Sequence, residues 1–139
     1  MNSNRLLIVE DDEVFSATLS RRMTNKGFQC VTAATASDAL LQCHQHRPNF
    51  VLLDMKLEHD SGLDLIKPIR NLLPSSKIIL LTGFASIATA VDAIKLGADD
   101  YLSKPIDTQT LMTALNGKKV APSEPNIEEP ETLSAEQAE

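Results

Sequence analysis

Short apolar segments alternate five times with longer segments of helical periodicity along the first 117 residues. The short segments have the length and composition of β-strands. Three of them are almost continuously apolar, which is typical of parallel strands that are covered on both faces of a sheet. The five predicted strands are Arg5–Val9, Phe28–Thr32, Phe50–Asp54, Lys77–Leu81 and Asp100–Leu102.

The segments between the strands place apolar residues three or four positions apart, the spacing that puts them on one face of a helix. One such stripe follows each strand, so the chain is expected to contain five strand–helix units. The stripes are Phe15, Leu19 and Met23; Ala36, Ala39, Leu40 and Cys43; Leu65, Ile69, Leu72 and Leu73; Ile87, Ala90, Val91 and Ile94; and Leu111, Ala114 and Leu115.

Residues at the ends of these stripes predict where the helices begin and end. Thr35, with Asp38 three positions later, forms a capping box that opens the second helix. Asp107 is expected to cap the fifth helix, and Gly97 to end the fourth. Pro68 lies inside the third stripe, where its missing N–H is expected to kink the helix or to shorten its start.

Five strand–helix units predict a doubly wound α/β fold, (βα)5, in which a five-stranded parallel sheet has helices on both faces. A barrel is excluded because it needs eight units and about 250 residues. We expect one folded domain over residues 4–117. Residues 118–139 contain three prolines and no continuing periodicity, so we interpret them as an acidic, proline-containing linker or disordered tail.

Charge is distributed unevenly along the chain. The formal net charge is −6 at pH 7, and the six glutamates among the last twenty residues account for all of it. The globular part offers no basic stripe for nucleic acid, so DNA contact is expected only through a domain that this sequence does not contain.

No apolar run reaches the ~20 residues of a membrane helix, and the first residues lack a signal-peptide pattern, so we expect a cytoplasmic protein. Cys30 and Cys43 are interpreted as buried apolar residues.

Carboxylates follow two of the apolar strands directly. Glu10, Asp11 and Asp12 come after the first strand, and Asp54 ends the third. In a parallel sheet the carboxyl ends of the strands lie at one edge, where ligands bind. Clustered like charges repel one another and are tolerated when a cation lies among them. We therefore predict one shared cation site at this edge, and its oxygen ligands favour Mg²⁺.

Two further strand ends carry groups suited to binding a phosphoryl group. Beside Mg²⁺, Asp54 is a candidate nucleophile that would form an acyl phosphate. Thr82 offers a hydroxyl and Lys104 an ammonium, and both are expected to contact phosphoryl oxygens. Alone, Thr82 and Gly83 indicate only a turn and Lys104 only a surface lysine, so the hypothesis depends on the order of all these residues together.

Together these residues resemble the receiver domain of response regulators in two-component signalling, which has a CheY-like, flavodoxin-like fold. The resemblance covers residues 4–116 and implies a signalling module rather than an enzyme. It is especially close from Lys95 to Pro105. The matching motifs are Glu10-Asp11-Asp12, Asp54, Thr82-Gly83, Tyr101 and Lys104-Pro105.

This resemblance implies a role for each acidic residue of the predicted site. A sensor histidine kinase would phosphorylate Asp54. Mg²⁺ would be held by Glu10, Asp11, Asp54 and the backbone carbonyl of Lys56. The glutamate at position 10 replaces an aspartate that is common in the family, and it lengthens the reach to the metal by one methylene. Asp12 is the least expected ligand of the three neighbouring acids and is instead expected to cap the first helix.

The resemblance also implies a phosphorylation-dependent switch. Thr82 and Tyr101 would form the switch pair, Lys104 would contact the phosphoryl group, and the peptide bond between Lys104 and Pro105 would be cis. Phosphorylation would shift the population toward a second conformation. In that conformation, the face formed by the fourth helix, the fifth strand and the fifth helix would bind a partner or a second copy of the chain.

A narrower resemblance concerns residues 81–91, which are similar to the RegA/PrrA/ActR group of redox-responsive regulators. In that group a proline-containing linker joins the receiver to a small helix-turn-helix domain of the Fis type. Residues 118–139 resemble that linker. The expected output is therefore control of transcription through DNA-binding helices that this sequence lacks. The alternative is a stand-alone receiver that acts as a phosphorelay or protein-interaction module.

Two enzyme or cofactor-binding functions fit these residues less well. Haloacid-dehalogenase phosphatases place a second aspartate two residues after the nucleophile, and Lys56 occupies that position here. Flavodoxin-like FMN proteins need a glycine- and hydroxyl-rich loop after the first strand, where this chain has acids that repel phosphate.

A metal site at Cys43, His44 and His46 is disfavoured because these positions do not converge on one helix face.

Overall fold

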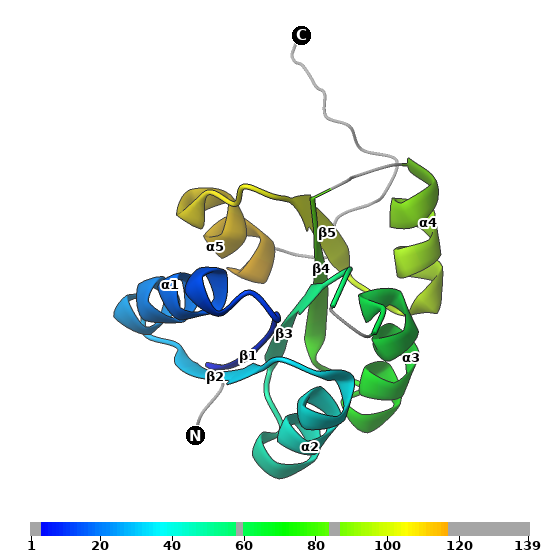
Figure 1. Ribbon diagram of the computed structural model, residues 1–139, viewed down its shortest axis with the longest axis horizontal. Helices are drawn as coiled ribbons and strands as arrows, with labels where there is room; N and C mark the ends of the chain where they lie inside the picture. Colours follow the sequence, from blue (N-terminus) through cyan, green and yellow to red (C-terminus); the bar gives the residue numbers. More distant parts are fainter. Residues whose placement is uncertain (1–3, 58–59, 84–86, 117–139) are drawn as a thin grey trace, which may run out of the picture.

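The computed structural model describes residues 4–57, 60–83 and 87–116. Within these ranges the chain forms a central sheet between two layers of helices (Figure 1). The predicted linker or tail at residues 118–139 lies outside the described residues. The elements are β1 (Arg5–Val9), α1 (Glu13–Asn25), β2 (Gln29–Ala33), α2 (Ala36–His46), β3 (Phe50–Asp54), α3 (Gly62–Leu72), β4 (Lys77–Thr82), α4 (Ile87–Leu96), β5 (Asp100–Ser103) and α5 (Thr108–Asn116).

All neighbouring strands of the sheet are parallel, in the order β2-β1-β3-β4-β5. β1 lies between β2 and β3. The chain therefore adds β2 on one side of β1 and then adds β3, β4 and β5 on the other side. The carboxyl ends of β1 and β3 therefore flank the point where the strand order reverses, and ligands bind at such points in open α/β sheets. The doubly wound fold expected from the sequence is confirmed.

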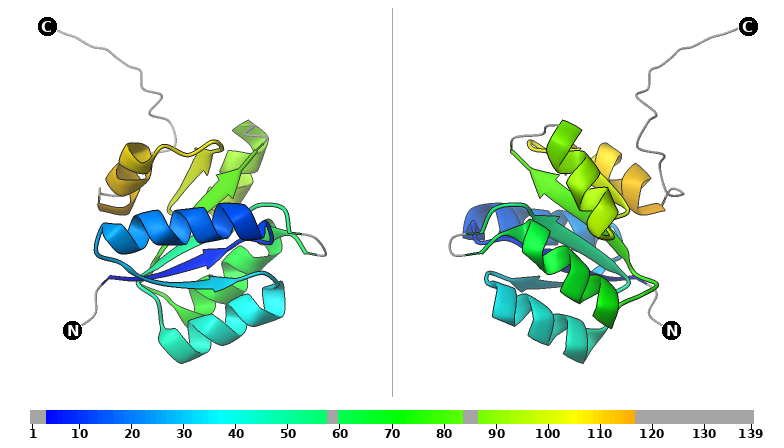
Figure 2. Two further views of the ribbon diagram at one scale, coloured as in Figure 1. Left: turned by 60° about the vertical axis from the view of Figure 1, so that its left-hand side comes forward. Right: turned by 90° about the vertical axis from the view of Figure 1, so that its right-hand side faces the viewer.

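Each face of the sheet is covered by its own helices (Figures 1 and 2). α1 and α5 cover one face, whereas α2, α3 and α4 cover the other. In β1, Leu6 and Ile8 pack toward α1 and α5, while Leu7 and Val9 pack into the opposite core. All four side chains are fully buried, which explains why this strand is continuously apolar. None of the helices in the described ranges has the length and apolar character needed to span a membrane.

The helix ends follow the capping residues that the sequence predicts. Asp12, Thr35 and Asp107 each accept a hydrogen bond from the backbone N–H three residues later, at 3.1, 3.2 and 3.0 Å. Gly97 follows α4 with a φ of 123°, a conformation that glycine adopts without strain. Pro68 lies well inside α3, so the expectation that it shortens the start of this helix is wrong. The buried face of α3 outweighs one missing backbone hydrogen bond.

The two cysteines behave as apolar residues. Cys43 is fully buried between α2 and the sheet, and burial raises the pKa of its thiol to about 11. Cys30 is partly buried against the core under α1 and α5. Both thiols are free, and the interpretation as buried residues is confirmed for Cys43, whereas Cys30 is only partly buried.

Arg70 connects the loops at the amino-terminal edge of the sheet, opposite the acidic strand ends. Its guanidinium donates hydrogen bonds to the carbonyls of Ser76 and Gly97, at 2.6 and 2.8 Å. It also donates to the carboxylate of Asp99 at 2.7 Å, and that carboxylate accepts the Ile78 N–H at 2.9 Å. α3 is thereby bound to the start of β4 and to the loop between α4 and β5.

Replacing this arginine tests how much the connection contributes to stability. Arg70→Met is expected to destabilise the fold by about 2–4 kcal/mol, because the Asp99 carboxylate and several carbonyls lose the charged donor that they share while the aliphatic packing is kept. The measurement is the free energy of unfolding in urea, followed by circular dichroism. Arg21→Met, at an exposed position of α1, is the matched control and is expected to cost less than about 0.5 kcal/mol. Equal effects of the two substitutions would contradict the specific role of Arg70.

Candidate functional site

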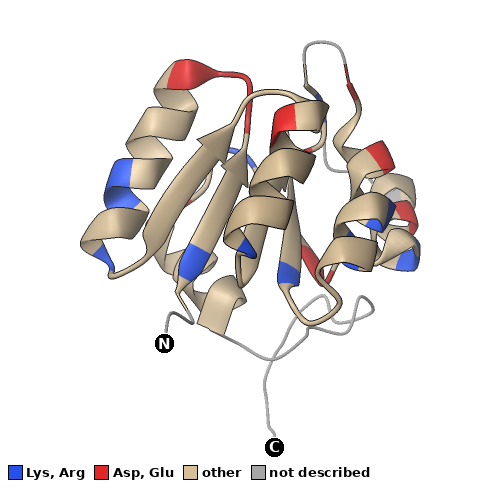
Figure 3. Cartoon of the chain, turned by 90° about the horizontal axis from the view of Figure 1, so that it is seen from below, with Lys and Arg blue, Asp and Glu red and all other residues tan. Residues whose placement is uncertain are grey.

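Three acidic side chains converge at the carboxyl edge of the sheet. Glu10 and Asp11 follow β1, and Asp54 is the last residue of β3, which pairs directly with β1. One carboxylate oxygen from each of these residues lies within 4.8 Å of the others. Figure 3 shows acidic positions at the edge to which the strand arrows point, and several Lys and Arg positions at the opposite edge. The predicted meeting of the two strand ends is confirmed.

Glu10 and Asp54 are the two deeply buried acids of this cluster, with 4% and 6% of their surfaces exposed. Burial raises the pKa of both carboxyl groups, because a charge that leaves water is disfavoured. Hydrogen bonds from Lys104 lower both pKa values without cancelling the effect of burial, and the nearby charge of Asp11 raises that of Asp54 further. The cluster therefore holds negative charge at an energetic cost that a cation would relieve.

Lys104 lies between the two buried carboxylates. Its Nζ is 2.7 Å from Glu10 Oε1 and 3.1 Å from Asp54 Oδ1. Burial lowers the pKa of the ammonium, but its hydrogen bonds to the two carboxylates outweigh burial and leave the pKa raised. The backbone N–H of Lys104 donates to the Thr82 carbonyl at 2.8 Å, and the peptide bond to Pro105 is cis, as the resemblance implied. The lysine is thus fixed to the end of β4 and reaches the acids.

Thr82 and Tyr101, the predicted switch pair, lie on the neighbouring strands β4 and β5. Thr82 is the last residue of β4 and is only 1% exposed. Tyr101 is the second residue of β5 and is partly buried against the core under α2, α3 and α4. Both residues therefore belong to strands that lead to the acidic edge, while their action as a switch stays a prediction.

Asp12 and Lys56 lie in the loops next to the carboxylate cluster. The exposed side chain of Asp12 caps α1, and its backbone N–H donates to the Glu10 carboxylate at 3.1 Å. Asp12 is not among the three acids that converge, which agrees with the preference for Glu10 and Asp11 as ligands. Lys56 is exposed and pairs with Ser61 in a short antiparallel bridge. The role of its backbone carbonyl as a metal ligand stays a prediction.

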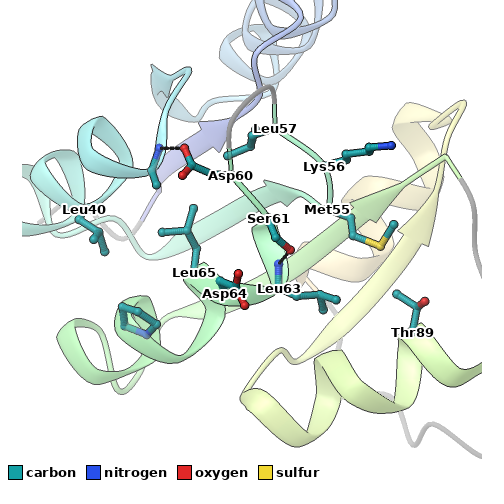
Figure 4. Close-up of a pocket in the computed structure, with 12 residues that line it drawn as sticks. Leu40, Met55, Lys56, Leu57, Asp60, Ser61, Leu63, Asp64, Leu65 and Thr89 are labelled. Carbon is teal, nitrogen blue, oxygen red and sulfur yellow. Dashed lines mark hydrogen bonds between the residues drawn. The ribbon is translucent and has the colours of Figure 1, made fainter.

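The loop between β3 and α3 is attached to two helices (Figure 4). Asp60 accepts a hydrogen bond from the Ala36 N–H at 3.3 Å, which connects the loop to the start of α2. Ser61 accepts the Leu63 N–H at 3.2 Å and caps α3. These residues border an open hollow of about 860 Å³, whose wall also includes Thr89 of α4. The three clustered acids are not part of its wall, but Lys56, whose carbonyl is a predicted metal ligand, is, so the hollow adjoins the candidate site.

Two residues beside the site were not predicted from the sequence. Gly62, the first residue of α3, lies so close to the backbone of Asp54 that a Cβ would be 2.0 Å from the Asp54 carbonyl oxygen. Phe15, assigned only to the apolar stripe of α1, places its ring centroid 4.4 Å from Lys104 Nζ. A glycine in the first turn of a helix is a signal that could have indicated the close approach of Gly62 to Asp54. The contact between Phe15 and Lys104 depends on packing between distant segments and leaves no signal in the sequence.

Comparison with known families places the chain among signalling proteins. The family model of the response regulator receiver domain matches residues 6–116, which is most of the chain. The chain belongs to the response-regulator receiver family. Receiver domains are the parts of two-component response regulators that interact with histidine kinases, so this receiver domain is a signalling module.

The receiver domain is similar to two named regulators. It is 42% identical over 123 residues to the photosynthetic apparatus regulatory protein RegA of Rhodovulum sulfidophilum, covering 87% of this chain and 67% of that protein. It is 40% identical over 122 residues to the acid tolerance regulatory protein ActR of Rhizobium meliloti, covering 86% of this chain and 63% of that protein. The resemblance to the RegA/ActR group is therefore confirmed, and the receiver spans about two thirds of the length of these relatives.

Solved structures show the same fold. A response regulator from Burkholderia pseudomallei, with a phosphorylated aspartic acid, a calcium ion and citrate, is 41% identical with a TM-score of 0.79, covering 81% of this chain and 66% of that one. A CheY-like receiver domain protein from Methanospirillum hungatei is 32% identical with a TM-score of 0.75, covering 78% of this chain and 87% of that one. The CheY-like fold expected from the sequence is confirmed.

Proposed function

We propose that Asp54 of this receiver domain accepts a phosphoryl group from the phosphohistidine of a sensor kinase. The observation that carries the proposal is the convergence of Glu10, Asp11 and Asp54 at the switch point of the sheet, with the Lys104 ammonium 3.1 Å from Asp54 Oδ1. A bond would form between an Asp54 oxygen and phosphorus as the bond from phosphorus to the histidine nitrogen breaks. The Burkholderia pseudomallei relative, with its phosphorylated aspartic acid, supports this assignment.

The cation of the site is Mg²⁺ in this proposal. The three carboxylates are close enough to share one ion, and Mg²⁺ prefers oxygen ligands. Glu10, Asp11, Asp54 and the backbone carbonyl of Lys56 would hold it, and the calcium ion of the Burkholderia pseudomallei relative supports a divalent cation at such a site. The bound ion would neutralise charge on the phosphoryl group during its transfer.

Thr82 and Lys104 contact the phosphoryl oxygens after transfer in this proposal. The new group adds about −1.5 to −2 charges beside a buried hydroxyl and an ammonium, and both attract it. Thr82 then moves toward the phosphoryl group, and Tyr101 moves into the space that Thr82 leaves. The result is a shift toward a conformation in which the α4–β5–α5 face binds a partner. Val91 of α4, an exposed large apolar side chain, supports an interaction on this helix.

The output proposed for this switch is control of transcription. The receiver is 32% identical over 131 residues to the transcriptional regulatory protein ZraR of Salmonella typhimurium, of which it covers 30%. Dimerisation through the α4–β5–α5 face would bring two DNA-binding domains together. The codons that follow Glu139 test this part of the proposal. A helix-turn-helix encoded there supports it, and a stop codon favours a stand-alone receiver in a phosphorelay.

Labelling with a small phosphodonor tests the assignment of Asp54. Incubation with acetyl phosphate and Mg²⁺ is expected to add one phosphoryl group, because the small donor replaces the kinase. Intact-protein mass spectrometry measures the addition, and borohydride reduction followed by peptide mapping locates it. Asp54→Asn, or a chelator in place of Mg²⁺, is expected to abolish the label. A label on another residue, or full labelling without a divalent cation, contradicts the proposal.

A further inference from the structure

We propose that Phe15 is a positioning residue that holds the Lys104 ammonium over the acidic site. The Nζ of Lys104 is 4.4 Å from the centroid of the Phe15 ring, well within the ~6 Å over which an aromatic face attracts a cation. The same Nζ contacts Glu10 on one side and Asp54 on another. The ammonium is thus enclosed by two carboxylates and one aromatic ring. The inference rests on the phosphoryl-binding role proposed above for Lys104.

Phe15 is held in place by the first turn of α1 and by the core beneath this helix. Its backbone N–H donates to the capping carboxylate of Asp12, which sets the first turn of α1. The side chain packs, partly buried, against the core under α1 and α5. The ring also borders a groove of about 400 Å³ together with Pro105 and Ile106, the two residues that follow Lys104. α1 therefore packs against the segment that carries the lysine, and Phe15 lies at this contact.

An aromatic ring suits this position better than an aliphatic side chain of similar size. A lysine stem has four rotatable carbons, and fixing its end in one place has an entropic cost. The ring attracts the ammonium and offers no oxygen, so it does not compete with the acceptors of the site. Because the attraction of a ring face has little directionality, Lys104 can exchange Glu10 for phosphoryl oxygens and keep its contact with Phe15. Phe15 thereby acts through Lys104 and does not touch the phosphoryl group itself.

The alternative is that Phe15 serves only as an apolar core residue. Phe15→Leu and Phe15→Tyr distinguish the two roles, because leucine keeps the apolar packing without the ring and tyrosine keeps the ring. Phe50→Leu is the matched control, since Phe50 packs against the same core and pairs edge-on with Phe28. A core role predicts that Phe15→Leu and Phe50→Leu have similar effects on the Lys104 proton shifts and on the affinity for a phosphoryl analogue.

Proton NMR tests the contact directly and needs no phosphorylation. In the native chain, the ε-methylene protons of Lys104 are expected to resonate upfield of ordinary lysine values, because their carbon is bonded to the Nζ that lies over the Phe15 ring. The upfield shift should disappear in Phe15→Leu and persist in Phe15→Tyr and Phe50→Leu. Ordinary lysine shifts in the native chain would overturn the inference whatever the outcome of the labelling experiment.

Binding of beryllofluoride in the presence of Mg²⁺ tests the consequence of the contact. Phe15→Leu is expected to bind this phosphoryl analogue about fivefold more weakly than the native chain, and Phe15→Tyr within about twofold of it. Phe50→Leu should bind normally, and thermal melts show whether each variant is folded. Failure of the native chain to bind contradicts the proposed function. Normal binding by the native chain with equal affinities of Phe15→Leu and Phe15→Tyr overturns the positioning role alone.

Discussion

Asp11→Asn is expected to weaken Mg²⁺ binding by at least about tenfold and, in the absence of metal, to stabilise the fold by about 1 kcal/mol. Both effects have one cause. A carboxylate oxygen of Asp11 lies within 4.8 Å of one from Glu10 and one from Asp54, so its charge attracts a divalent cation and repels the buried carboxylate of Asp54. Unlike Glu10 and Asp54, it is not held by the Lys104 ammonium, so its removal breaks no ion pair among the residues that the structure describes.

The measurements for this variant are isothermal titration calorimetry with Mg²⁺ and urea unfolding in the presence of a chelator. Asp12→Asn is the matched control, because it removes the same charge one residue away and asparagine still caps α1. The control is expected to change Mg²⁺ affinity by less than about threefold and stability by less than about 0.5 kcal/mol. Equal losses of Mg²⁺ affinity in the two variants would mean that the cluster acts only through its general charge.

Gly62→Ala is expected to destabilise the protein by about 3 kcal/mol or more and to slow phosphoryl labelling of Asp54. The new Cβ would lie 2.0 Å from the Asp54 carbonyl oxygen and 3.0 Å from the Met55 Cα. These are backbone atoms, so they cannot rotate away as a flexible side chain would. Either α3 or the end of β3 must move. A movement of β3 would displace Asp54 and with it the acidic site. Urea unfolding measures the first effect, and the rate of acetyl phosphate labelling measures the second.

Gly83→Ala is the matched control for this substitution. Outside its chain neighbours, a Cβ at Gly83 meets no atom of the described residues within 4 Å, so the change is expected to alter stability by less than about 1 kcal/mol. The comparison separates a steric clash from the general effect of replacing glycine in a loop or turn. A stability of Gly62→Ala equal to that of the native chain would show that the close contact between α3 and β3 is not maintained in solution.

The strands were predictable because burial on both faces of a sheet demands continuous apolar runs. β1 and β3 match their predicted limits, since Leu6 to Val9 and Val51 to Leu53 are fully buried. β2 begins one residue later than expected. Phe28 is apolar and buried, but its N–H bonds to the Met23 carbonyl at the end of α1 rather than to β1. The hydrophobic pattern alone does not distinguish a buried residue that ends a helix from one that starts a strand.

The chemistry of the candidate site was also visible in the sequence, because it resides in residue types at strand ends. Glu10, Asp11 and Asp54 could be brought together by topology alone. The hydrogen bond from Lys104 to Glu10 could not be predicted from topology, because it depends on how a long side chain crosses the site. The contacts of Gly62 and Phe15 are equally a matter of packing distance rather than of sequence pattern.

A crystal structure of the chain with Mg²⁺ and beryllofluoride tests the assignment of the site most directly. We expect beryllium to be bonded to an Asp54 carboxylate oxygen and the cation to be held by Glu10 and Asp11. The Lys104 ammonium is expected to contact a fluoride, where it now contacts Glu10 Oε1 at 2.7 Å. Beryllofluoride bound at another residue, or a cation bound away from Glu10 and Asp11, would contradict Asp54 as the phosphoryl acceptor of a Mg²⁺-dependent receiver.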